Sequence, residues 1–217
     1  MIRTTIDIDL SRKEVIQTEH LIFRCLDRED IPQLMELTRD PKLIENAIMR
    51  VDFTEESFGE FLDSLPKTPT PAVTMFGMFM KDDPTELYGM ISYTLISLQE
   101  APRMSLWIRE RHRRRRMFSE VVPALLDFAF LVHRLDAIHA DAFPCQRMTP
   151  TMALKYGFKF IGYRREFAAM QGREIIMSVM ELTRTDWLAN REQFVRRSSM
   201  VHPLPQRSLS PQLSSLA

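Results

Sequence analysis

The chain has 217 residues, of which 45% are hydrophobic and 27% are charged, as expected for a globular protein of one ordinary domain. Its 29 basic and 29 acidic side chains balance, which excludes a global electrostatic attraction to nucleic acid or to a membrane surface. Cys25 and Cys145 are far apart in the sequence and lack a metal-binding spacing, so we expect reduced cysteines and no bound metal. Because the sequence has no run of about 18 apolar residues and no apolar signal core near Met1, we expect a cytoplasmic protein.

The first half of the chain predicts one strand, three helices and two long strands. Residues 1–17 are polar and read as a lead-in of uncertain structure. The strand and the three helices are expected at 20–27, 27–40, 41–49 and 54–65. An acidic first turn and Pro32 near the start of the first helix fit the chemistry of helix entry. Strands at 72–81 and 87–97 flank the turn "KDDPTE" and should pair as an antiparallel hairpin.

The second half continues with a strand, "RMSLWI" at 103–108, and an arginine-rich turn that leads into a helix extending to about His133. The remaining elements are a strand at 135–143, a short helix at 147–156 that stops at Gly157, two strands at 158–170 and 174–183, and a closing helix at 184–195. Residues 196–217 contain six serines and three prolines without an apolar period, so we expect a disordered tail.

This order of elements predicts an α+β fold with a mixed, mostly antiparallel sheet and helices on both faces. A helix between two strands of one sheet demands at least one parallel crossover. The expected organisation is a lead-in at 1–17, a single domain at 18–195 and the tail at 196–217.

Four phrases of the sequence resemble the GNAT acetyltransferases, in particular the RimJ/RimL-type branch that acetylates N-terminal amines of ribosomal and other substrates. They are "LIFRCLDREDIPQLMELTRDPKL", "WIRERHRRRRMFSEVVPALLDFAF", "HRLDAIHADAFPCQRMTPTMALKYGFKFIGYRRE" and "ELTRTDW". The resemblance covers roughly residues 20–190 and keeps both order and spacing in its second half. It implies a GNAT-like sheet and an N-acetyltransferase that uses acetyl-CoA.

In the resembled family one strand splays from its neighbour, and its backbone pairs with the pantetheine arm of acetyl-CoA. The resemblance places that strand at "RMSLWI", with Leu106, Trp107 and Ile108 nearest the cofactor. The turn that follows usually reads Gln/Arg-x-x-Gly-x-Gly/Ala, and its amides face the pyrophosphate. Here the turn carries no glycine, and the implied cofactor-binding residues are Arg113, Arg114, Arg115, Arg116, Met117 and Phe118.

The missing glycines change how this turn can hold a phosphate. Glycine adopts positive φ cheaply and lets a phosphate approach the backbone closely. The run of four arginines instead offers guanidinium groups, which bind phosphate oxygens through paired hydrogen bonds. Its interpretations are a CoA-like anion, another acidic partner, or no specific role; nucleic acid is disfavoured because no aromatic residues interleave. Pro123 further suggests that the following helix starts no earlier than Ser119.

Two residues before the last helix of the resembled region retain functional groups of the family. Gln146 stands where the family often has Asn, which implies a role in holding the cofactor backbone. Thr149 stands where it often has Ser, which implies donation of a proton to the departing CoA sulfur; the alternative is a helix N-cap. Tyr156, next to Gly157, is expected to pack within the fold and not to act as the acid.

The general base is less well specified by the sequence. Attack by an amine requires that one proton be removed, often by a carboxylate. The carboxylates in plausible segments are Glu110, Glu166 and Glu181.

The sequence therefore predicts an enzyme that transfers acetyl from acetyl-CoA directly to a primary amine, either a peptide N-terminus or a small amine. The alternative is a catalytically inactive GNAT-like module that binds an acidic ligand or partner. A different acyl donor is a third reading. No membrane partner is expected, and monomer and homodimer both stay open.

Overall fold

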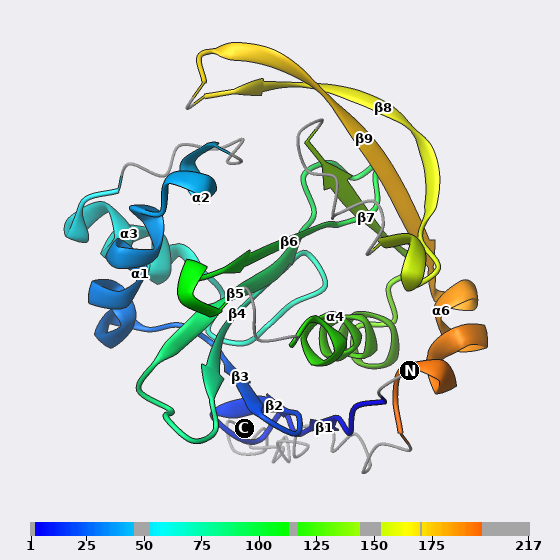
Figure 1. Ribbon diagram of the computed structural model, residues 1–217, viewed down its shortest axis with the longest axis horizontal. Coiled ribbons are helices and arrows are strands. Elements are labelled where there is room, and N and C mark those ends of the chain that lie inside the picture. The colour runs from blue at the N-terminus through cyan, green and yellow to red at the C-terminus, as the bar shows by residue number, and fades with distance from the viewer. Residues whose placement is uncertain (1–2, 46–52, 113–116, 144–152, 170, 197–217) are drawn as a thin grey trace, which may run out of the picture.

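The computed structural model describes residues 3–45, 53–112, 117–143, 153–169 and 171–196 (Figure 1). These residues build a nine-stranded sheet in the order β1-β2-β3-β4-β5-β6-β7-β9-β8. The strands are β1 (Asp7–Ile8), β2 (Glu14–Gln17), β3 (Leu21–Arg24), β4 (Val73–Met80), β5 (Leu87–Thr94), β6 (Arg103–Ile108), β7 (Ala137–Ala142), β8 (Lys159–Ala168) and β9 (Arg173–Thr183).

The helices lie between these strands, except for α6 and η4, which follow β9. They are η1 (Arg28–Asp30), α1 (Ile31–Thr38), α2 (Pro41–Glu45), α3 (Glu55–Ser64), η2 (Glu110–His112), α4 (Phe118–Asp127), η3 (Phe128–Val132), α6 (Arg184–Asn190) and η4 (Arg191–Gln193). Thr54 caps α3, because its hydroxyl accepts from the amide of Ser57 at 3.2 Å. Of the tail predicted at 196–217, all but Arg196 lies outside the described residues.

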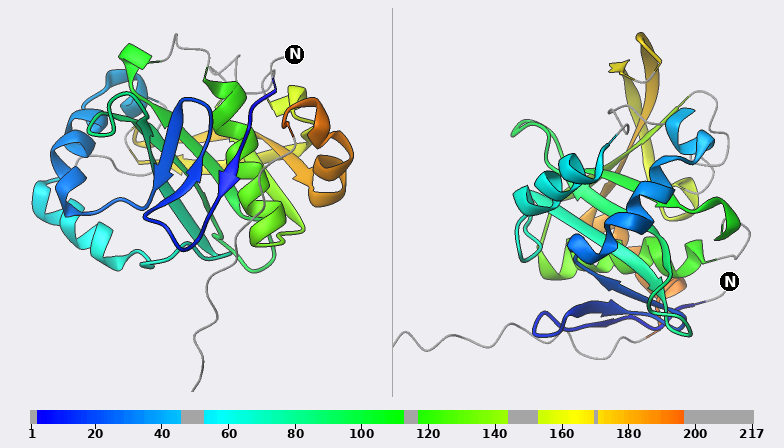
Figure 2. Two further views of the ribbon diagram at one scale, coloured as in Figure 1. Left: turned by 90° about the horizontal axis from the view of Figure 1, so that it is seen from below. Right: turned by 90° about the vertical axis from the view of Figure 1, so that its left-hand side faces the viewer.

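The sheet is antiparallel except between β6 and β7, which run parallel. The connection between these two strands passes through α4, the crossover that the order of elements demands. Helices cover both faces, with α1 and α3 on one side of β4–β6 and α4 on the other (Figures 1 and 2). The α+β class and the mostly antiparallel sheet predicted from the sequence are confirmed.

Two hydrophobic cores follow from this layering. The larger one fills the space between α4 and the sheet and includes Phe76, Tyr93, Leu125 and Ile138. The smaller core, on the opposite face, is formed by these residues of α1, α3 and the strands beneath them: Leu34, Leu37, Phe58, Leu62, Phe79 and Met90. Alternate residues of one strand therefore point into different cores.

Residues 4–17, which the sequence assigns to a lead-in, are part of the same sheet. β1 pairs with β2, β2 pairs with β3, and Thr4 forms a parallel bridge with Val195. Ile6 and Ile16 have no exposed surface and belong to the larger core. Strands this short carry little periodic signal, and their burial depends on a core that residues from the whole domain build.

Gly157 ends the helical turn at residues 153–155, as predicted. Its φ is +93°, a value at which any side chain would strain the backbone. The amide of Phe158 closes the turn by donating to the carbonyl of Ala153 at 3.1 Å. The start of the predicted helix at 147–156 lies outside the described residues.

Helix α4 begins at Phe118, one residue earlier than Pro123 was expected to allow, so the proline lies inside the helix. Proline has no amide hydrogen to give to the carbonyl four residues before it. Every residue from Glu120 to Asp127 is buried, and burial of this length of helix outweighs the loss of one hydrogen bond. The helix then widens into the π-helical turn η3.

A buried carboxylate on α4 ties the helix to the turn between β2 and β3. Glu120 accepts from the hydroxyl of Thr18 at 2.6 Å, from the amide of His20 at 3.0 Å and from its Nδ1 at 2.7 Å. The hydrogen bond to Glu120, together with its charge, raises the pKa of His20 above its ordinary value.

This pair should make the stability of the protein depend on pH. Because the folded-state pKa of His20 is raised, its contribution is fully present below pH about 6.5 and is lost as the pH rises through the raised value. The His20 side chain is 54% exposed, so we expect less than about 1 kcal/mol. Urea unfolding of wild type and His20→Gln across this range measures the difference. A difference that stays constant with pH contradicts the assignment.

Candidate active site

Strands β6 and β7 separate over most of their length. β6 pairs with β5 from Arg103 to Ile108, but its only pairs with β7 in the described residues are Arg103 with His139 and Met104 with Ala140. β7 instead pairs with β9 along its whole length. Beyond Met104, β6 therefore has no strand partner on its β7-facing side within the described residues, which is the separation that the family resemblance implies for the cofactor strand.

The predicted cofactor residues on β6 face both sides of the sheet. Leu106 packs against the larger core with Met104, whereas Trp107 packs against the smaller core. Phe118, the first residue of α4, also packs against the larger core and so lies on the other face of the sheet from the Trp107 side chain. Its carbonyl accepts from the hydroxyl of Tyr156 at 2.9 Å. Tyr156 is buried and packs in the fold, as expected.

Several predicted site residues lie outside the described residues. These are Arg113, Arg114, Arg115 and Arg116 of the turn, and Gln146 and Thr149. Their roles stay predictions. Met117, which follows the arginines, is half-buried, packs against the larger core, and is the N-cap position of α4.

The residues between β6 and the arginine turn are held by acidic partners that sequence reasoning missed. Arg109 is 5% exposed and pairs with Glu36 of α1. Arg111 and His112 both contact Glu86, at 2.7 and 3.0 Å. The His112 ring also stacks on Tyr88, with 5.0 Å between centroids. This segment is therefore anchored to α1 and to the β4–β5 connection, and the basic side chains of Arg109, Arg111 and His112 are paired with carboxylates of the protein itself.

A charge cluster lies where β6 and β7 begin to separate. We use this name for Glu100, Arg103, Asp141, Arg164 and Glu166. Arg103 donates to Glu166 at 2.5 Å and to Glu100 at 3.2 Å. Arg164 donates to Asp141 at 2.6 Å and to Glu100 at 3.0 Å. Three strands and the β5–β6 connection thus meet through ion pairs at this point.

The charge cluster is on the face of the sheet opposite α4. Arg103 precedes Met104, and Asp141 lies between Ala140 and Ala142; all three of these neighbours belong to or pack on the larger core under α4. Because successive side chains of a strand point to opposite faces, Arg103 and Asp141 point away from α4. His139 shares this face and contacts Glu181 of β9 at 3.2 Å.

The surroundings of the charge cluster shift the pKa values of two of its carboxyl groups in opposite directions. Burial raises the pKa of Asp141, and the attraction of Arg164 and Arg103 only partly opposes this rise. Burial also acts on Glu100, but the hydrogen bond from Arg103 and the charge of Arg164 prevail and lower its pKa. The two pKa values therefore differ because Asp141 is more deeply buried than Glu100.

The three carboxylates predicted as general bases are not brought together. Glu110 is exposed in η2, Glu166 pairs with Arg103, and Glu181 contacts His139. Asp141 and His139, which the sequence analysis did not single out, lie closer to the point of separation. A polar residue at every second position of an otherwise small and apolar strand, "AIHADA", is the only signal that could have found them.

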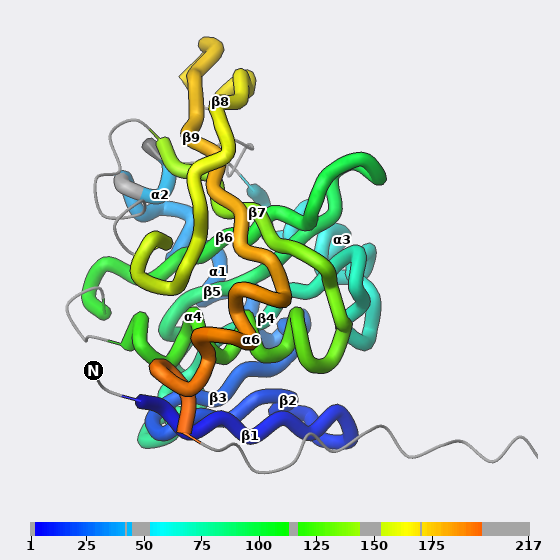
Figure 3. Tube along the Cα trace, turned by 90° about the vertical axis from the view of Figure 1, so that its right-hand side faces the viewer, coloured from blue at the N-terminus to red at the C-terminus, as the bar shows by residue number. Residues whose placement is uncertain are grey.

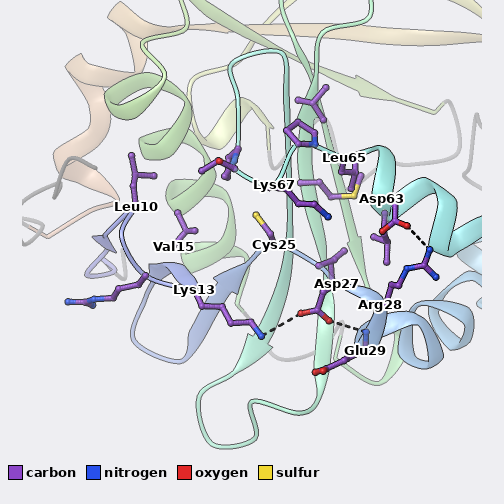
Figure 4. A pocket seen from close by; sticks show the side chains of 18 residues that line it. Leu10, Lys13, Val15, Cys25, Asp27, Arg28, Glu29, Asp63, Leu65 and Lys67 are labelled. Atoms are coloured by element: carbon purple, nitrogen blue, oxygen red, sulfur yellow. Dashed lines mark hydrogen bonds and ion pairs between the residues drawn. The ribbon is translucent and has the colours of Figure 1, made fainter. Parts of the chain in front are cut away.

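A cavity of about 690 Å³ lies elsewhere, between the start of β2, the residues after β3 and the end of α3 (Figure 4). Charges across it are matched, since Lys13 pairs with Asp27 at 3.5 Å and Arg28 with Asp63 at 2.5 Å. No residue of β6 or β7 lines it. The cavity therefore does not belong to the candidate active site.

Within the described ranges, no three His, Cys, Asp or Glu side chains are placed to hold a metal ion. The same part of the chain holds no helix long and apolar enough to cross a membrane.

Residues 20–159 match the model of a family described as the acetyltransferase (GNAT) domain. Among solved structures, the fold is similar to spermidine N-acetyltransferase from Vibrio cholerae in complex with CoA and spermine, with a TM-score of 0.66, 16% identity, and coverage of 77% of this chain and 98% of that chain. An acetyltransferase of the GNAT family from Bacillus anthracis gives a TM-score of 0.64 at 18% identity, covering 77% and 96%. No curated protein matches the sequence.

Proposed function

The chain belongs to the acetyltransferase (GNAT) domain family and is an enzyme, and from that premise we propose that it transfers acetyl from acetyl-CoA to a primary amine by direct attack. The observation that carries the proposal is the separation of β6 from β7 beyond Met104. An open strand edge next to the start of a ten-residue helix suits a long ligand that has amides along its arm and phosphates at its end.

Different residues along and after β6 would hold different parts of acetyl-CoA. The backbone beside Leu106, Trp107 and Ile108 would align the pantetheine arm, and the arginine turn with Met117 and Phe118 would hold the phosphates. Acetyl-CoA supplies a thioester carbonyl that an amine can attack once the two are held together. Positioning then accounts for most of the acceleration, because the thioester is already reactive. Thr149 would donate the proton that the departing sulfur takes up, and Gln146 would help hold the cofactor backbone.

The acceptor is a primary amine, either a peptide N-terminus, as in the RimJ/RimL-type branch, or a small amine. The similar structure from Vibrio cholerae is described as a spermidine N-acetyltransferase in complex with spermine, which gives one small amine to test. Both acceptor classes would approach from the face opposite α4, where the charge cluster lies.

Binding of acetyl-CoA should stabilise the protein measurably. At a concentration about 100 times the dissociation constant, we expect the free energy of unfolding to rise by about 2.7 kcal/mol. Denaturant unfolding with and without acetyl-CoA measures this rise. Release of free thiol on adding spermidine or a peptide with a free N-terminus then measures transfer. No stabilisation at millimolar acetyl-CoA excludes the proposed function.

The same titration tests the arginine turn. If its guanidinium groups replace glycine amides, Arg114→Gly with Arg116→Gly should weaken acetyl-CoA binding at least about tenfold, because each removes a charge-assisted hydrogen bond. The control is Arg184→Gly, at an arginine that pairs with Asp136 far along the chain. Tighter binding by the double variant would instead show that the arginines obstruct a degenerate site.

A further inference from the structure

One oxygen of Asp141 lacks a partner at the mouth of the splayed strands. Its Oδ2 accepts from Arg164 at 2.6 Å and lies 3.9 Å from Nε of Arg103. Its Oδ1 is buried and has no hydrogen-bond partner in the described residues. The Asp141 side chain as a whole is 8% exposed. Buried polar atoms of native proteins are nearly always paired. Nε of Arg103 is also unpaired in the described residues, but the Asp141 oxygen that it approaches is Oδ2, so Oδ1 is left for a donor from outside the chain.

The position of Asp141 along the strands places it near the reacting end of the cofactor; this step rests on the proposed function. The phosphates of acetyl-CoA lie at the end of β6 that leads into the arginine turn. β6 rises about 3.3 Å per residue, so an arm laid from Ile108 back to Ser105 spans about 10 Å toward the point of separation. Asp141 directly follows the last β6–β7 pair, Met104 with Ala140. The thioester end is therefore directed toward Asp141.

The charges facing Asp141 favour a cation. Arg103 of β6 and Arg164 of β8 bring positive charge, and the surrounding carboxylates are Glu100 of the β5–β6 connection and Glu166 of β8. His139 lies on the same face and pairs with Glu181 of β9. With Asp141 itself, the three carboxylates of the charge cluster stand against its two guanidinium groups. A ligand that brings positive charge restores the balance.

The hairpin of β8 and β9 extends over this face (Figures 1 and 3). Its turn reaches α2, where Nε2 of Gln171 donates to the carbonyl of Ile44 at 3.2 Å. Phe143 packs with Ala168, Ile175 and Met177 beneath it. The hairpin therefore lies on the side of the sheet from which the acceptor would approach Asp141.

We propose that Asp141 holds the acceptor: its free Oδ1 accepts a hydrogen bond from the primary ammonium group of a cationic aliphatic amine and then takes one proton from it. The amine nitrogen then forms a bond to the acetyl carbonyl carbon, and the carbon–sulfur bond breaks with its electron pair on sulfur. The departing sulfur takes up a proton from the general acid of the proposed function, the nitrogen's second proton restores that acid, and Asp141 returns its own proton to water. Burial raises the pKa of Asp141, which makes it a stronger base than an exposed aspartate.

The test compares Asp141→Asn with wild type and with Asp136→Asn. Asp136 is a matched control, since it also pairs with an arginine, Arg184, at 3.0 Å, but its side chain is 94% exposed. With spermidine at pH 7, Asp141→Asn should lower kcat/KM for the amine at least about 100-fold, and Asp136→Asn less than about twofold. The dissociation constant of acetyl-CoA should change less than about twofold in both variants, which also shows that they fold.

A second readout separates proton removal from a structural role. The loss caused by Asp141→Asn should shrink as the pH approaches 10, because the amine then reaches the enzyme already neutral. For the same reason it should be smaller, at pH 8, for a peptide N-terminus, whose pKa is about 7.7–8.0, than for spermidine. A loss that is equal at every pH and for both acceptors overturns the role of Asp141 as proton acceptor.

The outcomes also separate this proposal from the proposed function. If wild type binds acetyl-CoA and acetylates an amine but Asp141→Asn does so equally well, Asp141 is not the acceptor site and the function stands. If wild type neither binds acetyl-CoA nor releases thiol with any amine, the proposed function fails, and the assignment of Asp141 fails with it.

Discussion

Arg191→Ala is expected to lower the free energy of unfolding by about 3–5 kcal/mol, because it leaves a buried carboxylate without its counter-charge. Arg191 donates to Asp127 through Nε and Nη2, both at 2.7 Å, and Nε1 of Trp187 donates to the same carboxylate at 3.0 Å. Asp127 is 1% exposed at the end of α4. This one carboxylate joins α4 to α6 and η4, so the loss of its partner should destabilise the whole domain. Urea unfolding at pH 7 measures the change.

Two companion variants distinguish this effect from a general loss of surface charge. Arg184→Ala removes an arginine from the exposed pair with Asp136 and should cost less than about 1 kcal/mol. Adding Asp127→Asn to Arg191→Ala removes the stranded charge and keeps an acceptor for Trp187, so it should recover more than half of the loss. If Arg191→Ala is as mild as Arg184→Ala, the buried pair does not carry this part of the fold.

The same carboxylate should make the defect depend on pH. Burial raises the pKa of Asp127 in wild type, and Arg191 and Trp187 only oppose this rise. Without Arg191 the folded-state pKa rises further, so the folded variant is favoured when Asp127 is protonated and loses stability as the pH rises through that value. The difference between variant and wild type should therefore be smaller at pH 5 than at pH 7.

Gly89→Ala is expected to lower kcat/KM about 100-fold, because it pushes the candidate cofactor strand out of place. Gly89 lies opposite Ile108 in the β5–β6 pair. A Cβ added there would lie 2.1 Å from the carbonyl oxygen of Trp107 and 2.9 Å from Cα of Ile108. Backbone atoms cannot turn aside as a side chain can, so β6 itself must shift. A displacement of about 1 Å at a reacting centre is enough for this loss.

Stability should suffer less than activity in Gly89→Ala. We expect a cost of about 1–3 kcal/mol, as for an overpacked core, and a clear weakening of acetyl-CoA binding. The control is Gly59→Ala in α3, where the added Cβ meets a nitrogen of the Arg28 guanidinium at 2.8 Å. That side chain is 62% exposed and can move, so this variant should keep activity and stay at least as stable. Normal acetyl-CoA binding by Gly89→Ala would show that β6 does not position the cofactor.

Much of the fold could be predicted from the sequence because its signals are local. The strand at 103–108 has the same bounds in the structure, the cap of α3 is at Thr54, and Gly157 stops its helical turn. Each of these features depends on residues that are close together in the sequence. Strands β1 and β2 could not be predicted in this way, since they are only two and four residues long and their side chains are buried in a core shared with α4 and the later strands.

For the candidate site, the family resemblance named the strand that separates from its neighbour, and the four arginines that follow this strand can be read from the sequence. The tertiary structure alone decided which charges neutralise one another. Arg109 meets Glu36, Arg103 meets Glu166, and both pairs join elements that are far apart in the chain. Which side chains form such ion pairs depends on which strand lies next to which, and in what register. Neither can be read from the pattern of residues along a single strand. For the same physical reason, the unpaired oxygen of Asp141 is visible only once β6, β7, β9 and β8 have taken their places in one sheet.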